Sequence, residues 1–177
     1  MPGYWLVRWR TGHDVREQGS GGTGATNVGR VLGGAGFIVV LLLDALKGAL
    51  AVLVARWLCG AEAWVPWAAA LSVVTGHVWP VFLSFRGGKG VATLVGAWLV
   101  LQPAAFLFCV PVFAVAWLFL RRFTLAGLCG LCLLPTGTAW AAGWARLPAL
   151  WAGLCLLVVL FAHKEHLRRW LHPQAAD

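Results

Sequence analysis

Charged residues are scarce in this sequence, and acidic ones are the scarcest. Only 11% of the 177 residues are charged, and just six of them are Asp or Glu. An ordinary soluble domain is about 25% charged and about 45–50% apolar. This chain is 60% hydrophobic, with a mean hydropathy of +0.80. One small core cannot hide that much apolar surface from water, so the composition favours a polytopic membrane protein.

Several familiar signatures are also missing. The sequence has no GxSxG nucleophile elbow, no HExxH zinc motif and no HxxxxD pair of the kind that soluble glycerolipid acyltransferases use. No segment interleaves aromatic and basic residues, so we expect no nucleic acid partner despite a net charge of +8. Cys129 and Cys132 form a lone CxxC in an apolar run, which we interpret as packing. His163 and His166 are three residues apart but have no further ligands nearby, so we expect no metal.

Apolar runs dominate what remains. A membrane-spanning helix needs about 20 apolar residues. The chain begins with a short apolar stub, residues 1–9, which reads as the remnant of a first helix whose beginning is absent. The sequence predicts one integral membrane domain over 1–177, an all-α polytopic helix bundle. We expect a cytoplasmic loop at 10–35, a cytoplasmic tail at 163–177, and membrane segments at 36–57, 64–85, 91–102, 104–120, 125–144 and 149–162.

The basic residues predict the orientation of these segments. Cytoplasmic loops carry an excess of Lys and Arg. With residues 10–35 inside, eleven of the 14 Lys and Arg residues lie on the cytoplasmic side, only Arg56 and Arg146 lie outside, and Lys47 falls within a span. This orientation brings the opening loop, the RGGKG loop and the tail to one face. We therefore expect a single site at the cytoplasmic surface.

Two glycine-rich segments on that face suit a phosphate group. They are GSGGTGATNVGR at 19–30 and RGGKG at 86–90. Glycines leave backbone N–H groups accessible, and a helix beginning near Val91 would direct its positive end to the same place. A nucleotide P-loop would need Ser or Thr after the lysine, but Gly90 follows Lys89. A plain membrane turn would explain the second segment alone, but not the density of donors in both.

Asp44, Lys47 and His77 lie well within the predicted spans. Asp44 and Lys47 have i, i+3 spacing, so they share a helix face. Charges at membrane depth are costly, and pairing relieves that cost. The pair either locks two helices together or braces the polar site. His77 is either a hydrogen-bonded core group or a support for the same site.

Four segments together resemble a known family. GSGGTGATNVGR is similar to a first motif, usually GSGNxGATNVxR, and LLLDALKGALAV resembles a DxxKG helix. GHVWPVFLSFRGGKGVAT is nearly a complete second motif, and FAHKEHLRRWL resembles a weakened third motif, usually HRxNIxRL followed by a glycine and a glutamate. The chain thus resembles the bacterial acyl-phosphate:glycerol-3-phosphate acyltransferases of the PlsY type, which are seven-helix membrane enzymes.

The resemblance implies transfer of a fatty acyl group from acyl phosphate to the 1-hydroxyl of glycerol 3-phosphate, giving lysophosphatidic acid and phosphate. It implies no cofactor, and a monomer in contact with membrane lipid in the bacterial inner membrane. It also assigns site residues by motif. These are catalytic Ser20, Arg30 and Lys89; phosphate-binding Thr26, Asn27, Arg86, Gly87, Gly88, Gly90 and Thr93; and supporting Asp44, Lys47, His77 and His166.

The sequence departs from the family pattern at a few positions. Gly22 replaces the first-motif asparagine, and His166 occupies the usual asparagine position of the third motif. Leu171, His172 and Pro173 stand where the glycine and glutamate usually follow. Two alternatives stay open on these grounds: a non-catalytic relative, and a small membrane transporter for a phosphorylated solute.

Overall fold

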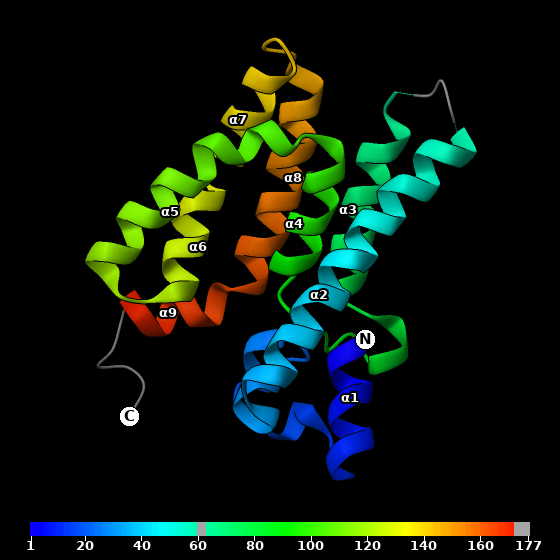
Figure 1. Ribbon diagram of the computed structural model, residues 1–177, viewed down its shortest axis with the longest axis vertical. Helices are drawn as coiled ribbons and strands as arrows, with labels where there is room; N and C mark the ends of the chain where they lie inside the picture. Colours follow the sequence, from blue (N-terminus) through cyan, green and yellow to red (C-terminus); the bar gives the residue numbers. More distant parts are fainter. Residues whose placement is uncertain (60–62, 172–177) are drawn as a thin grey trace.

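The computed structural model describes residues 1–59 and 63–171, and within these ranges the chain is helical with no strands. The predicted all-α bundle is confirmed (Figure 1). Three short 3₁₀ turns separate or precede helices: η1 Val15–Glu17, η2 Val81–Leu83 and η3 Pro103–Ala105. The helices are α1 Pro2–Thr11, α2 Ala25–Cys59, α3 Val65–Val78, α4 Val91–Leu101, α5 Phe106–Leu120, α6 Phe123–Leu131, α7 Leu134–Ala141, α8 Arg146–Ala162 and α9 Lys164–Leu171.

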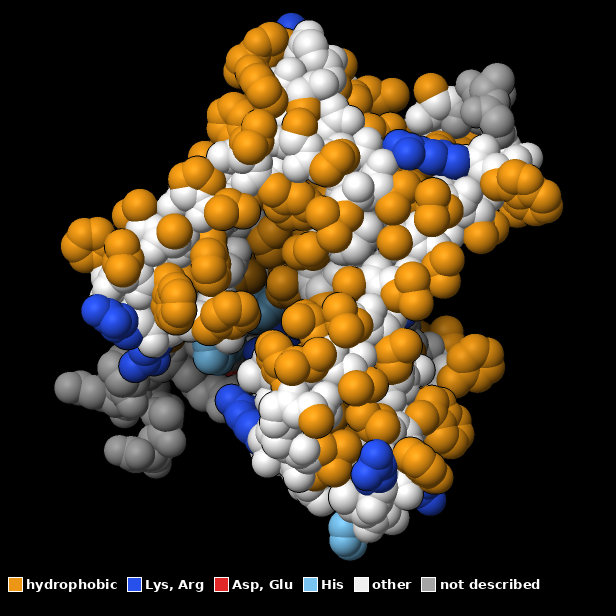
Figure 2. Space-filling view, in the orientation of Figure 1, with side chains coloured by type: hydrophobic (Ala, Val, Ile, Leu, Met, Phe, Trp, Pro, Cys, Tyr) orange, Lys and Arg blue, Asp and Glu red, His pale blue; other side chains and the backbone are white. Residues whose placement is uncertain are grey.

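Lengths and exposed side chains identify a multi-pass membrane protein. Four described stretches are long and apolar enough to cross a bilayer: Ala25–Cys59, Val65–Leu83, Pro103–Leu120 and Phe123–Ala141. Helices α4 and α8 are apolar but shorter. Large hydrophobic side chains such as Leu42, Phe119 and Leu157 are more than half exposed. Hydrophobic side chains are spread over the whole face seen in Figure 2, whereas Lys and Arg appear there at only a few places, which suits lipid rather than water.

The structure departs from the expected boundaries at the first loop. Helix α2 begins at Ala25, so residues 25–35, expected in a loop, are helical apart from Gly33. Gly33 has φ 74° and ψ −171°, a backbone conformation that side-chain-bearing residues rarely adopt, and it kinks the helix. The first motif therefore continues into a short helix that leads to the long apolar one.

Other predicted segments also differ from the helices in the structure. The predicted 125–144 segment is two short helices, α6 and α7, and the 149–162 segment begins earlier, at Arg146. The expected tail carries helix α9. The predicted stub is helical and runs from Pro2 to Thr11, where Gly12 closes it at φ 75°.

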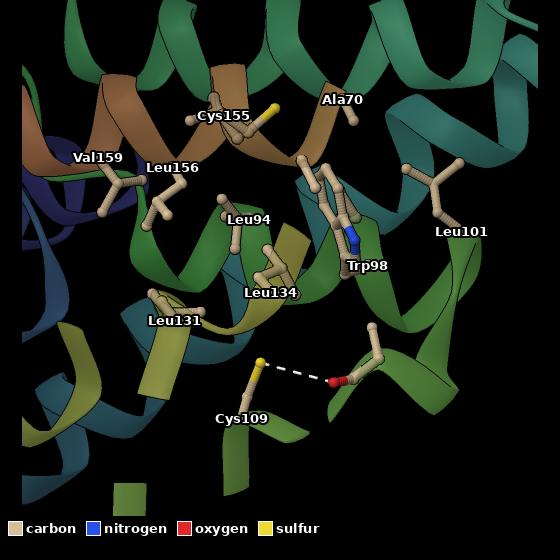
Figure 3. Packing of buried hydrophobic residues seen from close by; sticks show 14 of the residues in the cluster. Ala70, Leu94, Trp98, Leu101, Cys109, Leu131, Leu134, Cys155, Leu156 and Val159 are labelled. Atoms are coloured by element: carbon tan, nitrogen blue, oxygen red, sulfur yellow. Dashed lines mark hydrogen bonds between the residues drawn. The ribbon is translucent and has the colours of Figure 1, made fainter. Parts of the chain in front are cut away.

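Helix α4 packs against α2 and α3, and six of its eleven residues are buried. Leu94 and Trp98 are completely buried among side chains of α3, α7 and α8 (Figure 3). Trp98 Nε1–H donates to Thr138 Oγ1 at 2.9 Å, and its ring meets Trp67 edge-on with the centroids 5.9 Å apart. This packing holds the beginning of α4 in a fixed place.

Candidate functional site

A cavity of about 290 Å³ lies where the cytoplasmic-side loops of the predicted topology meet the bundle. Figure 2 shows a hollow between the α5–α6 region and α2, with basic and histidine side chains at its edge. The loop before α2, the two parts of α2, the loop before α4, and helices α3, α4, α6, α8 and α9 all meet near it. Predicted site residues that line it are Ser20, Thr26, Asn27, Arg30, Asp44, His77, Gly88, Lys89, Gly90 and His166.

Four predicted site residues do not line the cavity. Arg86 is exposed, and Gly87 lies against the carbonyls of α3. Thr93 is fully buried and contacts His77, while Lys47 reaches Asp44. These four residues lie outside the cavity lining in this structure. Motif position alone does not reveal which side of a loop or helix faces a cavity.

Asn27 organises the first glycine loop. Its Oδ1 accepts from Ser20 N–H at 2.8 Å, and its Nδ2 donates to the carbonyls of Val15, Gln18 and Gly22 at 2.9–3.1 Å. The side chain is only 2% exposed. Although we expected Asn27 to bind phosphate, its amide is directed into the loop and shapes the cavity wall.

Two contacts join the first loop to the second. Thr23 N–H donates to the Gly87 carbonyl at 3.3 Å, and Arg16 Nη1 donates to the Leu83 carbonyl at 3.0 Å. Asp14 holds Arg16 through a fork of hydrogen bonds, and this Arg16 contact lowers the pKa of the Asp14 carboxyl. This clamp was not predicted from the sequence. Its only signal is a D-x-R spacing, which is too common to single out.

The second loop is docked on the end of α3. The N–H groups of Gly87 and Gly88 donate to the carbonyls of Val78 and His77 at 3.2 and 3.1 Å. They are therefore not directed at an anion, contrary to the predicted nest. The helix start near Val91 is confirmed: Gly90 is the N-cap of α4, with φ 82°. Gly90, Val91 and Ala92 line the cavity, so the positive end of α4 faces it.

A buried polar cluster adjoins this loop. Lys47 Nζ lies 2.6 Å from Asp44 Oδ1 and also contacts His77 Nδ1. Thr93 Oγ1 lies 3.2 Å from the same ring nitrogen. Asp44 and His77 line the cavity as well. The cluster therefore links α2, α3 and α4 and also touches the site.

His163 lines the cavity, whereas the sequence pattern had suggested only a candidate metal ligand at this position. It lies at the end of α8, 2% exposed, and Nδ1 donates to the Val159 carbonyl at 2.8 Å. Burial, with a smaller contribution from nearby Lys89 and His166, lowers the pKa of His163 to about 4. The ring is neutral near pH 7. Its place at the head of the third motif was the available signal. Among the described residues, no cluster of three or more His, Cys, Asp or Glu could hold a metal. His172 and Pro173, where the third motif diverges, lie outside the described residues.

The fold and the cavity define a multi-pass helical membrane protein with a basic, glycine-walled site at one end of its bundle. A family model described as glycerol-3-phosphate acyltransferase matches residues 1–173. The chain belongs to this acyltransferase family.

Relatives with this activity in their names align in sequence with nearly the whole chain. A glycerol-3-phosphate acyltransferase of Anaeromyxobacter sp. (strain Fw109-5) is 44% identical over 172 residues, which is 94% of this chain and 84% of the relative. One from Myxococcus xanthus (strain DK1622) is 43% identical over 94% of this chain and 86% of the relative.

Two solved structures of a related protein have a similar fold. PlsY, an integral membrane glycerol 3-phosphate acyltransferase, matches in its glycerol 3-phosphate form with a TM-score of 0.83 and 33% identity, over 96% of this chain and 84% of that one. Its lysophosphatidic acid form matches with a TM-score of 0.77 and 34% identity, over 88% of this chain and 79% of that one.

Proposed function

We propose that this chain moves a fatty acyl group from acyl phosphate to the 1-hydroxyl of glycerol 3-phosphate. The hydroxyl oxygen bonds to the acyl carbonyl carbon, the bond from that carbon to the phosphate oxygen breaks, and the hydroxyl proton leaves with the phosphate. The products are lysophosphatidic acid and inorganic phosphate. The observation that carries this proposal is a single cavity with a basic polar part and an apolar part.

The polar part suits two phosphate groups. Arg30 approaches from the short helical part of α2, and Lys89 approaches from the loop before α4. The beginning of α4 adds a partial positive charge. Donors fixed in place before the reaction stabilise negative charge as it develops on the acyl carbonyl and the departing phosphate. We assign Arg30 and Lys89 as catalytic, with Ser20 beside them.

The apolar part gives the acyl chain a route into lipid. It is walled by Phe37 and Leu41 of α2 and by Phe123, Gly127 and Leu128 of α6. Leu41 and Phe123 are also 37% and 63% exposed on the molecular surface, so the cavity adjoins the lipid-facing surface there. Ligand pockets are commonly about 300–1,000 Å³. At about 290 Å³ this cavity suits the reacting groups, and we expect a long acyl chain to extend between α2 and α6 into the bilayer.

The protonation state of His163 indicates which group accepts the proton of the glycerol hydroxyl. Because Nδ1 donates to the Val159 carbonyl, the neutral ring has no proton on Nε2, which can accept a hydrogen bond from the glycerol hydroxyl. A pKa of about 4 makes the ring a poor proton acceptor near neutral pH. His163 thus orients the hydroxyl, and an oxygen of the departing phosphate takes the proton. Holding the two reactants together in this geometry supplies much of the rate.

We place the site on the cytoplasmic face of the bacterial inner membrane, because the basic residues gather at that end. The protein acts as a monomer in contact with membrane lipid, without a cofactor. These assignments follow the positive-inside rule and the family resemblance.

The test is direct. The full chain, purified in detergent, is supplied with palmitoyl phosphate and glycerol 3-phosphate, and phosphate and lysophosphatidic acid are measured together. Equal amounts of both products support the proposal. Binding of glycerol 3-phosphate to folded protein without turnover would instead identify a non-catalytic relative. Uptake of labelled glycerol 3-phosphate into proteoliposomes without acylation would identify a transporter.

A further inference from the structure

Four polar side chains are packed together beneath the second glycine loop. Asp44, His77 and Thr93 are 2%, 4% and 0% exposed, and Lys47 reaches them from one helical turn along α2. His77 Nδ1 lies 3.5 Å from Asp44 Oδ1, 3.2 Å from Thr93 Oγ1, and in contact with Lys47 Nζ. Asp44 and Lys47 both belong to α2, so His77 of α3 and Thr93 of α4 connect this ion pair to the neighbouring helices.

The donors in this cluster determine the tautomer of His77. An ammonium group only donates hydrogen bonds. Lys47 donates to Asp44 Oδ1 and is in close contact with His77 Nδ1, whereas Asp44 Oδ1 lies 3.5 Å from that ring nitrogen, at the limit of a hydrogen bond. The closer donor favours an unprotonated Nδ1. The Thr93 hydroxyl donates or accepts as needed, and it imposes no opposite requirement. The neutral ring therefore carries its proton on Nε2.

The protonated nitrogen faces the site. A Cβ built on Gly88 would overlap His77 Nε2, so this nitrogen lies directly against the loop at Gly88. His77 and Gly88 both line the cavity beside Lys89. The surroundings of the ring and Lys47 also include Met1, whose Sδ lies 3.7 Å from Lys47 Nζ. Only a glycine at position 88 lets the edge of the His77 ring come so close to the backbone.

We propose that the Asp44–Lys47 ion pair holds His77 as the Nε2–H tautomer, so that this N–H donates a hydrogen bond to a substrate phosphate oxygen beside Gly88. This inference rests on the function proposed above. His77 is then a binding residue, and Asp44 and Lys47 are positioning residues that act through it. The opposite tautomer would present a lone pair to the phosphate and weaken binding.

Two replacements of His77 separate this role from simple packing. In His77→Asn the amide oxygen can still accept from Lys47, but no group reaches the position of Nε2. In His77→Gln the amide nitrogen reaches that position. We expect kcat/KM for glycerol 3-phosphate to fall roughly tenfold or more in His77→Asn, the size expected for one hydrogen bond to a charged group. His77→Gln should retain clearly more activity than His77→Asn. His13→Asn, an exposed histidine away from the cavity, is the matched control.

The ion pair is tested by removing both charges together. Asp44→Asn with Lys47→Met avoids leaving a buried charge without its partner. We expect a loss similar to that in His77→Asn, and no further loss when the three changes are combined, because all act through one hydrogen bond. Independent losses that multiply would overturn the coupling.

A nitrogen spectrum tests the tautomer without any need for turnover. Imidazole ¹⁵N NMR of the wild type, with the His77→Gln spectrum subtracted, should show a protonated Nε2 and an unprotonated Nδ1 for His77. Protonation at Nδ1, or equal kcat/KM in His77→Asn and the wild type, would overturn the inference. A wild type that transfers no acyl group would instead count against the proposed function.

Discussion

Gly96 of α4 packs directly against the backbone carbonyl of Ala45 in α2, and any Cβ at Gly96 would overlap that oxygen. Gly48 of α2 packs in return against the carbonyl of Thr93. The two helices cross with their backbones in contact, as small residues permit in membrane bundles. This crossing lies a few residues from Asp44 and from the beginning of α4, so it fixes the spacing between the two sides of the cavity.

Replacement of Gly96 by alanine should therefore destabilise the fold. Overpacking of this kind costs about 1–3 kcal/mol. We expect a lower Tm in detergent and reduced acyl transfer. Gly153→Ala on α8 is the matched control, because a Cβ there meets no other atom within 4 Å. Equal Tm values for the two variants would contradict the close crossing.

Arg30 and Lys89 should each be required for acyl transfer. Removing one fixed donor to a developing negative charge costs about 100-fold or more in rate. We expect Arg30→Ala and Lys89→Ala to lose that much activity while the protein still accumulates in membranes, as judged by immunoblotting. Arg146→Ala, an exposed residue at the start of α8, serves as the control. Normal turnover in either site variant would refute the assigned site.

Asn27 should be intolerant of the isosteric change to aspartate. A carboxylate cannot donate to the carbonyls of Val15, Gln18 and Gly22, and each unsatisfied buried group costs about 1–3 kcal/mol. Asn27→Asp should open the first loop, which limited proteolysis between residues 10 and 24 would detect, and should abolish activity. A loop as resistant as that of the wild type would show that these hydrogen bonds do not hold it.

His166→Asn should retain or increase acyl transfer. His166 lines the cavity, and a histidine and an asparagine can both donate a hydrogen bond from this position. The measurement is kcat and KM for both substrates. Complete inactivation would mean that the cavity has adapted to the imidazole.

His163 should make the stability of the protein depend on pH. The pKa of His163 is lowered from 6.5 to about 4 in the folded protein, so the unfolded chain binds a proton first as the pH falls. Stability should decline between about pH 6.5 and 4, by on the order of 3 kcal/mol if the whole shift is realised. In His163→Asn, whose amide can still donate to the Val159 carbonyl, Tm should vary less across that range. An unchanged pH profile would contradict a buried, neutral His163.

Sequence patterns predicted the apolar segments and much of the cavity lining. The apolar part of α2 that contains LLLDALKGALAV follows from local composition, and the start of α4 follows from the glycines that precede Val91. The pairing of Asp44 with Lys47 followed from their spacing alone. These features depend on residues close together in the chain.

The missed features depend on contacts between distant segments. The backbone N–H groups of Gly87 and Gly88 could have bound an anion, but α3 carbonyls accept them instead. Asn27 is a strong phosphate donor by type, yet three carbonyls from the preceding loop already accept its amide hydrogen bonds. The pKa of His163 is lowered chiefly by burial at the end of α8. No pattern of neighbouring residues in the sequence indicates which acceptor a hydrogen-bond donor contacts in the folded protein.

The apolar wall formed by α2 and α6 has a kinetic consequence. A reactant whose tail never leaves the bilayer meets the protein by diffusion in two dimensions, so its effective concentration is its mole fraction among the lipids. For the proposed reaction, adding more vesicles of the same composition should then leave the rate per protein unchanged, whereas diluting the acyl phosphate with inert lipid should slow it. The rate should depend on glycerol 3-phosphate, which arrives from water, through its ordinary bulk concentration. In the proposed reaction the cavity is thus the point at which a surface process and a solution process are joined.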